Sequence, residues 1–394
     1  MISAGKGIVL AVAALLIVGV VFVNSAALGV TGGEPVSLVG ILFGRHTLYA
    51  AAAMACLVLG SCLRVDSLAA GRGLRSPIPW IALLIVASVV AVHIPGVGKE
   101  VNGARRWIAL GALSFQPSEF AKWGIPILMA WWCTSNPDLL GRFWRGFVFP
   151  MAAIGVICLG IAGEDLGTAA LVMAVALVML LAAGARWVHA VALAPVGLLG
   201  FTALVWFSPY RVARILAYLD PYADPRGIGY HIVQSMGAIA GGGLTGRGLG
   251  NSVQKFGYLP EGTTDFILAI IAEESGVLGA GLVVGLYALL VWCAAAIVSS
   301  PSNGSERSLS PFARLLGLGV LTTVGLQALL NAAVVTGLAP TKGIALPLIS
   351  RGGTGWMLTA FSLGLLVSMD RPRSVRRSAA EDSPTETTSP MGAA

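Results

Sequence analysis

Charged residues are scarce in this chain. They make up 11% of its 394 residues, whereas hydrophobic residues make up 56%. A soluble domain contains roughly 25% charged residues, so an ordinary soluble domain is excluded. Long apolar runs recur along the whole sequence. A run of ~17–25 such residues can cross a ~30 Å hydrocarbon core as a helix. We therefore expect an all-α polytopic membrane protein.

Residues typical of metal, nucleotide and disulfide sites are few or unsuitably spaced. The four histidines are scattered without metal-ligand spacing. There is no Walker loop, and the glycines from Gly241 to Gly250 do not lie between a strand and a helix, as a dinucleotide fingerprint requires. All five cysteines fall within apolar runs, where Cys usually behaves as a small hydrophobe. No disulfide, organic cofactor or nucleic-acid partner is expected.

The apolar runs predict about ten transmembrane helices within a single domain over residues 1–375. The eighth run is longer than one crossing needs, so this helix is expected to tilt or to project beyond the bilayer. The predicted spans are 8–29, 46–64, 78–95, 117–134, 147–163, 166–184, 188–207, 266–298, 313–335 and 355–370.

Arginines in the short loops predict the orientation. Because positive charge is enriched on the cytoplasmic side, the side that carries these arginines should be cytoplasmic. An even number of spans then places both termini in the cytoplasm. The tail 376–394 is rich in Ser, Thr, Pro and Glu and is expected to be disordered. The loop arginines are Arg64, Arg72, Arg75, Arg142, Arg145, Arg186 and Arg307.

The opposite side has a long extracytoplasmic loop, about 208–264, between the seventh and eighth helices. It is too long for a plain connector. Apolar residues from Ile228 to Ile239 recur at helical spacing and predict a short amphipathic helix. Many cations lie on this side, which indicates binding of a polyanionic head group. Anchoring of long side chains at lipid head groups is the alternative. The cations are Lys99, Arg105, Arg106, Arg211, Arg214, Arg226, Arg247 and Lys255.

Acidic residues occur where this loop meets the eighth span. Asp265 lies at the start of the apolar run, where an acid is costly and usually functional. A helix-capping role is the alternative, because Asp suits the positive end of a helix. Glu273 and Glu274 come about two turns later, so one of them must face the bundle interior or a wet cavity.

Four separate stretches carry a resemblance to a known family. They are NGARRWIALGALSFQPSEFAKW (102–123), EDLGTA (164–169), the run from Asp224 to Phe266 that contains QKFGYLPEGTTDF, and NAAVVTGLAPTKGIALPLISRGG (331–353). In their order and spacing the chain resembles the SEDS proteins, the group of FtsW, RodA and SpoVE. QKFGYLPE and APTKG are more similar to the FtsW and SpoVE branch.

The resemblance implies a peptidoglycan glycosyltransferase of the bacterial cytoplasmic (inner) membrane. Such enzymes polymerise lipid II into β-1,4 glycan strands at the outer face, for cell division or related cell-wall synthesis. Their partners are a class B penicillin-binding protein and other divisome or elongasome membrane proteins. The family's catalytic aspartate matches Asp265. Its other motif residues match Arg105, Arg106 and Trp107, and Gln116, Ser118, Glu119 and Lys122.

The chemistry of the residues fits this role. A sugar hydroxyl needs a general base, which Asp265 could supply, and a leaving diphosphate needs positive charge. Arg105, Arg106, Arg214 and Lys255 are candidates for the diphosphate, and a divalent cation, Mg²⁺ or Mn²⁺, could share this work. A single displacement would invert the anomeric carbon.

Several motif residues have structural alternatives. Glu119 and Lys122 are spaced i, i+3 and could form a local ion pair. Asp165 could cap a helix. Trp107 could anchor at the membrane interface rather than stack on a sugar.

The chain departs from the family pattern at four places. Thr263 stands where a histidine is usual, His231 where glutamine is usual, and Glu164 where proline is usual. Arg351 stands in place of a tyrosine and could bind substrate phosphate. Two other functions remain open. A lipid II flippase should have a polar route through the midplane, and a non-catalytic division scaffold would not need Asp265, which this chain keeps.

Overall fold

The computed structural model describes residues 3–31, 43–71, 73–101, 104–110, 113–259, 261–300 and 309–371. The predicted disordered tail, 376–394, lies outside these residues. A helix occupies each of the ten ranges predicted to span the membrane. These helices are α1 (Ala4–Thr31), α3 (Arg45–Cys62), α4 (Pro77–Ala91), α5 (Pro117–Ser135), α6 (Phe149–Ala162, preceded by a π-helical turn, Phe143–Val148), α7 (Leu166–Ala182), α8 (Trp187–Trp206), α11 (Ile267–Val298), α12 (Pro311–Val335) and α13 (Gly353–Met369).

Helix length and composition identify a multi-pass membrane protein. Within the described residues, five segments are long and apolar enough to cross a membrane, and α4, α7 and α13 are shorter apolar helices. The total of ten crossings stays a prediction. The five segments are Ala4–Ala26, Phe143–Ala162, Trp187–Trp206, Ile267–Val298 and Pro311–Val335.

Local sequence explains where several helices begin. The side chains of Ser76, Asp165 and Ser310 accept hydrogen bonds from backbone N–H groups in the first turns of α4, α7 and α12. Such caps satisfy N–H groups that have no partner within the helix. Proline in the first turn of α4, α5 and α12 suits the same position, because it lacks an N–H.

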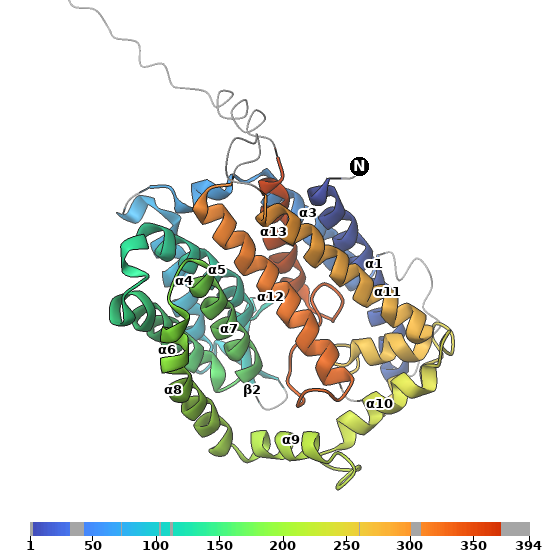
Figure 1. Ribbon diagram of the computed structural model, residues 1–394. Helices are drawn as coiled ribbons and strands as arrows, with labels where there is room; N and C mark the ends of the chain where they lie inside the picture. The colour runs from blue at the N-terminus through green and yellow to red at the C-terminus, as the bar shows by residue number, and fades with distance from the viewer. Residues whose placement is uncertain are drawn as a thin grey trace, which may run out of the picture.

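The helices form one bundle, which α12 crosses near its centre (Figure 1). Helices α3 and α13 approach closely because Gly60 and Gly364 face each other, and a Cβ on either would collide with the backbone of the other helix. The N–H of Gly5 donates to Asp370 Oδ2 at 3.0 Å, so the start of α1 and the end of α13 lie at the same end of the bundle.

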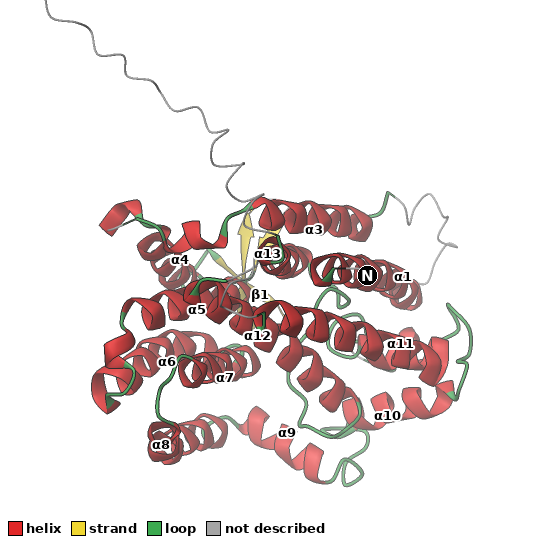
Figure 2. Ribbon diagram, turned by 45° about the horizontal axis from the view of Figure 1, so that its top comes forward, coloured by secondary structure: helices red, strands yellow, loops and turns green. Residues whose placement is uncertain are grey.

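Helix α8 lies at the edge of the bundle, where it meets the external loop. Only 6% of its apolar stretch is buried inside the protein. Two further helices, α9 (Pro209–Leu219) and α10 (Tyr230–Gly242), continue from it along one end of the bundle (Figures 1 and 2). The structure confirms the amphipathic helix predicted in the long loop, which is α10. The sequence did not predict α9.

A small sheet is the second unpredicted feature. Strands β1 (Gly98–Val101), β2 (Ala104–Leu110) and β3 (Leu113–Phe115) form an antiparallel sheet in the order β1-β2-β3. The register pairs Lys99 with Trp107 and Ala109 with Ser114. The chain is mostly helical, as expected, and the sequence did not predict these strands in the loop after the third span.

Helix α11 is broken at Gly276, which has φ 68°. The N–H groups of Val277 and Leu278 donate to Gly243 O and Leu244 O at 3.0 and 3.2 Å, instead of continuing the helix. A Cβ at Gly276 would collide with Leu244 O and would be strained at this φ. The eighth span is therefore long because it contains two helical segments joined at a break.

Candidate active site

Asp265 lies in the turn that precedes α11, and the backbone around it is fixed from two other segments. Its carbonyl oxygen accepts a hydrogen bond of 2.8 Å from Asn331 Nδ2 on α12. Ser350 Oγ donates to the neighbouring Thr264 O at 2.6 Å, and Arg351 N donates to Thr263 O at 2.9 Å. The third and fourth sequence motifs are thus joined at Asp265.

The segment between α12 and α13 is also fixed internally. Asn331 Nδ2 donates to Ile344 O at 2.8 Å, and Leu346 N donates to Ser350 Oγ at 2.7 Å. Asn331 and Ser350 are both buried. We did not single out either residue from the sequence, although Asn331 is a polar residue in an apolar helix and such residues need partners.

Two arginines meet Asp265 around this segment. A Cβ placed on Gly343 would lie 3.5 Å from both Arg106 Nη1 and Asp265 Oδ2, so these two atoms are within 7 Å of each other. Arg214 Nη1 donates to Thr341 O at 3.0 Å, and its guanidinium lies 4.4 Å from the ring centre of Tyr210. Glycine at 343 leaves the space between acid and cation open.

The surroundings of Asp265 raise the pKa of its carboxyl group to about 7. Burial is the largest cause, because it disfavours the charged form. The negative charges of Glu261 and Asp165 act in the same direction, whereas Arg214 and Arg106 oppose them. A carboxyl group that titrates near neutral pH can both take up and release a proton under physiological conditions.

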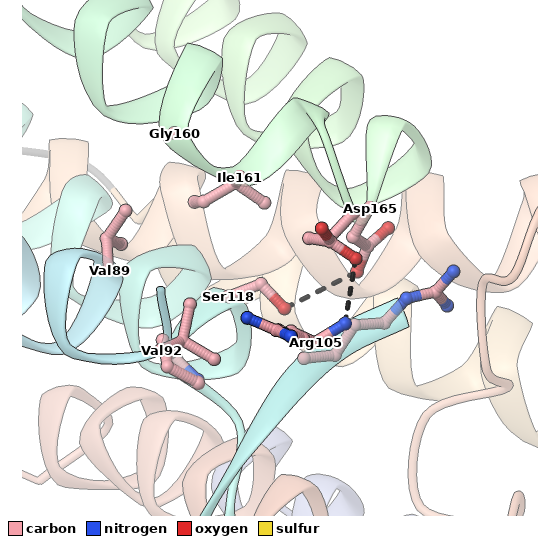
Figure 3. Close-up of a pocket in the computed structure, with 10 residues that line it drawn as sticks. Val89, Val92, Arg105, Ser118, Gly160, Ile161 and Asp165 are labelled. Atoms are coloured by element: carbon pink, nitrogen blue, oxygen red, sulfur yellow. Dashed lines mark hydrogen bonds between the residues drawn. The ribbon is translucent and has the colours of Figure 1, made fainter. Parts of the chain in front are cut away.

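A pocket lies beside this site and opens to the surface (Figure 3). Strand β2 contributes Arg105 and Arg106, and the turn between α6 and α7 contributes Glu164 and Asp165. Arg105 N donates to Glu164 Oε2 at 2.8 Å. Glu164, one of the departures from the family pattern, thus fixes β2 to this turn. Ser118 and five apolar or small residues complete the lining, the latter being Val89, Val92, Pro117, Gly160 and Ile161.

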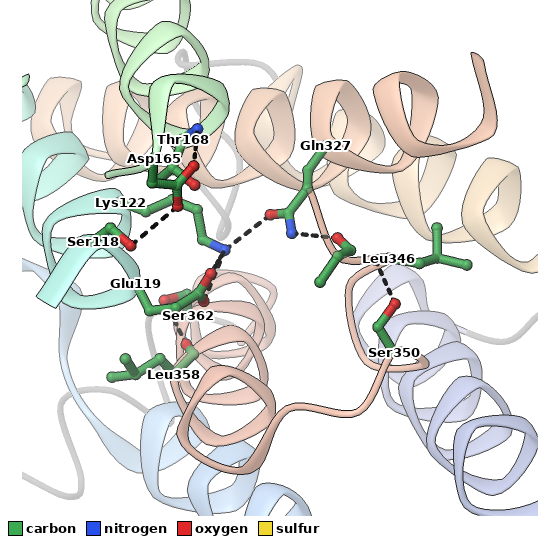
Figure 4. A network of polar contacts seen from close by, with 11 residues as sticks. Ser118, Glu119, Lys122, Asp165, Thr168, Gln327, Leu346, Ser350, Leu358 and Ser362 are labelled. Carbon is green, nitrogen blue, oxygen red and sulfur yellow. Dashed lines mark hydrogen bonds and ion pairs between the residues drawn. The ribbon is translucent and has the colours of Figure 1, made fainter. Parts of the chain in front are cut away.

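Residues of the first and second motif stretches form a buried polar network with Gln327 (Figure 4). Lys122 Nζ lies 2.7 Å from Glu119 Oε1 and 2.9 Å from Gln327 Oε1. The local ion pair that we considered for Glu119 and Lys122 is therefore present. Asp165 caps α7 by accepting from Thr168 N at 2.9 Å, and it lies 3.4 Å from Ser118 Oγ. The capping alternative for Asp165 is also confirmed.

The remaining predicted site residues differ in their exposure and in their contacts. Trp107 is half-buried on β2, and Gln116 immediately precedes α5. The side chains of Arg105 and Arg351 are exposed, and that of Arg105 lies 3.5 Å from Glu100. Lys255 is buried and bonds to Gly250 O. No contact among the described residues joins Lys255 to Asp265.

Lys342 is a cation of the segment between α12 and α13 that we did not select from the sequence. It lies between Thr341 and Gly343, and its Nζ is 5.7 Å from the ring centre of Phe201 on α8. Burial lowers the pKa of its ammonium group. The signal was the single lysine of the APTKG stretch, which places a charge in an otherwise uncharged segment.

A divalent cation is compatible with the donors present. Within the described ranges, no group of three or more His, Cys, Asp or Glu side chains could hold a metal ion. Mg²⁺, however, is commonly bound through one or two carboxylates together with substrate phosphates. Asp265 is the carboxylate that would fit this arrangement.

Glu273 and Glu274 are buried at the break of α11, and each accepts hydrogen bonds from other segments. Glu273 accepts from Ser252 Oγ at 2.5 Å and from Val253 N at 3.1 Å, and Glu274 accepts from Ser25 Oγ at 2.8 Å. Arg247 Nη1 is 3.5 Å from Glu273. These contacts fasten the end of the external loop and α1 to the broken helix.

The fold and the site define a multi-pass membrane protein with an acid and several cations gathered at one end of its bundle. A model of the FtsW, RodA and SpoVE cell cycle proteins matches residues 6–375. The chain therefore belongs to the FtsW/RodA/SpoVE family.

Individual relatives agree with this assignment. The chain is 40% identical to stage V sporulation protein E of Bacillus subtilis, over 74% of this chain and 79% of the relative. It is also 40% identical to a probable peptidoglycan glycosyltransferase FtsW of Methylococcus capsulatus, over 89% of this chain and 86% of the relative.

Solved structures show the same fold. One, described as a peptidoglycan synthase complex that coordinates polymerization and crosslinking, matches with a TM-score of 0.68 and 29% identity, over 93% of this chain and 97% of that chain. The rod shape determining protein RodA of Thermus thermophilus matches with a TM-score of 0.59 and 26% identity, over 93% and 96%.

Proposed function

We propose that this chain is a peptidoglycan glycosyltransferase that polymerises lipid II into β-1,4 glycan strands at the outer face of the cytoplasmic membrane. The observation that carries the proposal is the Asp265 carboxyl group, whose pKa is about 7 and which lies within 7 Å of the Arg106 guanidinium. An acid of this pKa beside a cation is the pair that glycosyl transfer from a diphosphate requires.

In the proposed reaction Asp265 takes the proton and the arginines stabilise the leaving group. The hydroxyl oxygen of the acceptor sugar attacks the anomeric carbon of the donor, and its proton passes to a carboxylate oxygen of Asp265. The bond from the anomeric carbon to the diphosphate oxygen breaks on the opposite side, so the configuration inverts. Arg106 and Arg214 stabilise the negative charge that develops on the diphosphate. Asp265 then releases its proton, which its pKa near neutrality allows.

Three further parts of the proposal concern the surroundings of the reaction. Asp265 is the residue that would hold a divalent cation, which would neutralise part of the phosphate charge. A class B penicillin-binding protein is the proposed partner, which the match to a peptidoglycan synthase complex supports. Both termini are proposed to lie in the cytoplasm of a bacterium, consistent with the contact between Gly5 and Asp370. The FtsW and SpoVE relatives favour a role in division or related wall synthesis.

Lipid II transport is the second candidate, because transporters often contain broken helices and buried charge near the midplane. Helix α11 has both features, at Gly276 and at Glu273 and Glu274. These carboxylates are already paired with Ser252, Arg247 and Ser25. Their pairing is better explained as structural support, so polymerisation is the preferred function.

The test is glycan synthesis from lipid II by the purified protein together with its penicillin-binding partner. Wild type should make polymer, and Asp265→Ala should make none while it remains folded. Asp220→Asn is the matched control, because Asp220 is an exposed acid of the same external loop, and it should polymerise normally. Equal polymer from wild type and Asp265→Ala would remove Asp265 as the base. Lipid II movement across vesicles without polymer would favour transport.

A further inference from the structure

His231 lies at the start of α10, directly beside the turn that carries Asp265. Its ring stacks on Phe266, with ring centres 5.8 Å apart and planes 13° from parallel. Phe266 is buried and follows Asp265 in the chain. The imidazole therefore contacts the residue that follows the proposed base, although His231 and Asp265 are far apart in the sequence.

The two ring nitrogens of His231 have different surroundings. Nδ1 is buried and has no hydrogen-bond partner among the described residues. The side chain as a whole is half-buried, so Nε2 is the nitrogen that remains accessible. A buried N–H without a partner would cost about 1–3 kcal/mol. The favoured tautomer therefore carries its hydrogen on Nε2, where a ligand can accept it.

The charges that face His231 are those that also face Asp265. Burial and the positive charge of Arg214 on α9 lower the pKa of the His231 imidazole, while Glu261 acts in the opposite direction. Arg214 and Glu261 also act on Asp265. The imidazole is therefore neutral at pH 7. A neutral N–H donor suits a hydroxyl or amide oxygen, whereas a phosphate is better bound by the arginines.

Packing does not explain why a histidine occupies this position. Helix α10 is attached to α12 by other residues, since Ile232 is buried and Ser235 Oγ donates to Val335 O at 2.7 Å. A phenylalanine at 231 would stack on Phe266 equally well and would leave no nitrogen unpaired. Retaining an imidazole with an unpaired buried atom next to a reacting group indicates a role for its other nitrogen.

We propose that His231 is a substrate-contacting residue of the Asp265 site, whose Nε2–H binds a hydroxyl or amide oxygen of a sugar ring of lipid II. This inference rests on the proposed function. Thr263, two residues before Asp265, has no imidazole, so the imidazole that lies next to this turn comes from α10. The residue supplies a hydrogen bond that orients the sugar, and the proton of the reaction still passes to Asp265.

Two substitutions test the contact in the polymerisation assay. His231→Phe keeps the stacked ring and removes both nitrogens, so kcat/KM should fall about 10-fold, the effect of roughly one hydrogen bond. His231→Gln replaces the donor with an amide and should recover most of the activity. The pH at which the rate is half-maximal should not move in either variant, because a neutral group adds no charge beside Asp265. His231→Phe with wild-type kcat/KM would overturn the proposal.

A measurement on the unmodified protein separates this proposal from the proposed function and needs no variant to fold. Diethyl pyrocarbonate modifies accessible neutral imidazole nitrogens, and mass spectrometry reports its rate at His231. Lipid II should slow this reaction at His231 and leave it unchanged at His189, whose ring is also half-buried with a buried Nδ1 but lies at the other end of α8 from the external loop. Slowing without any polymer synthesis would support the contact and reject the polymerase. An unchanged rate at His231 would overturn the contact even if polymer forms.

Discussion

The titration of Asp265 should respond in opposite directions to two neighbouring charges. Arg214 lowers the pKa of its carboxyl group and Glu261 raises it. If Asp265 acts as the base, it must be ionised, so the rate of polymerisation should fall as the pH drops through about 7. Arg214→Gln should move this acid limb to higher pH, and Glu261→Gln should move it to lower pH.

The distance between Arg106 and Asp265 gives a scale for the size of these shifts. Arg106 Nη1 is within 7 Å of the Asp265 carboxylate. A unit charge at about that distance is worth roughly 2 kcal/mol at an effective dielectric constant of about 20. Glu261 is exposed and Arg214 is half-buried, so solvent screens both. We therefore expect each substitution to move the midpoint by about 0.5–1 pH unit.

The assay is kcat/KM for polymerisation of lipid II between about pH 5 and about pH 9, which reports the ionisation of the free enzyme. Arg214→Gln should also lower the plateau, because Arg214 is proposed to bind diphosphate, but the midpoint is independent of the plateau. Asp220→Asn, which removes an exposed acid of the same loop, should leave the midpoint unchanged. Midpoints that stay fixed, or that move in the same direction for Arg214→Gln and Glu261→Gln, would refute the assignment of Asp265 as the titrating base.

Three further outcomes are expected. The folded-state pKa of Asp265 is raised from 3.8 to about 7, so the wild type loses stability as the pH rises over this range. The free energy of unfolding of Asp265→Asn should therefore exceed that of wild type by a growing amount up to about pH 7, and the difference should level off above it at no more than roughly 4 kcal/mol. A difference independent of pH would contradict the raised pKa. Glu119→Gln leaves the buried Lys122 ammonium without its counter-charge and should cost about 3–5 kcal/mol in thermal unfolding, whereas adding Lys122→Met should recover most of this loss; a double variant as unstable as the single one would show that the pair is not the cause. Asn331→Ala removes the hydrogen bonds to Asp265 O and Ile344 O and should lower kcat about 10-fold or more with KM little changed; unchanged kcat would show that Asn331 does not position the base.

The helical framework was largely predictable because it depends on local properties. A run of about 20 apolar residues can satisfy its backbone within a membrane only as a helix, and the structure has a helix at each predicted range. The break at Gly276 was not predictable from hydropathy. It exists because loop carbonyls at Gly243 and Leu244 take the place of helix carbonyls, which is a contact between distant segments.

In the candidate site too, the sequence identified single residues but not the contacts between distant segments. The TTDF sequence identified Asp265, and the NGARRW stretch identified Arg106, as residues that resemble those of a family. Neither pattern could show that Arg106 approaches Asp265 across Gly343, or that Asn331 holds the backbone of Asp265. Lys255 resembled the other cations in sequence, yet it is buried against Gly250.

Apolar length and motif residues are properties of short stretches of chain, so they were sufficient to predict the class of protein, the helical segments and the acid. Tertiary packing was needed to show which cations face Asp265, what raises its pKa to about 7, and that the His231 ring stacks on the next residue, Phe266. Burial and Coulomb interactions depend on distances between groups. Those distances are set by packing among segments up to about 240 residues apart, such as the segments that carry Arg106 and Gly343.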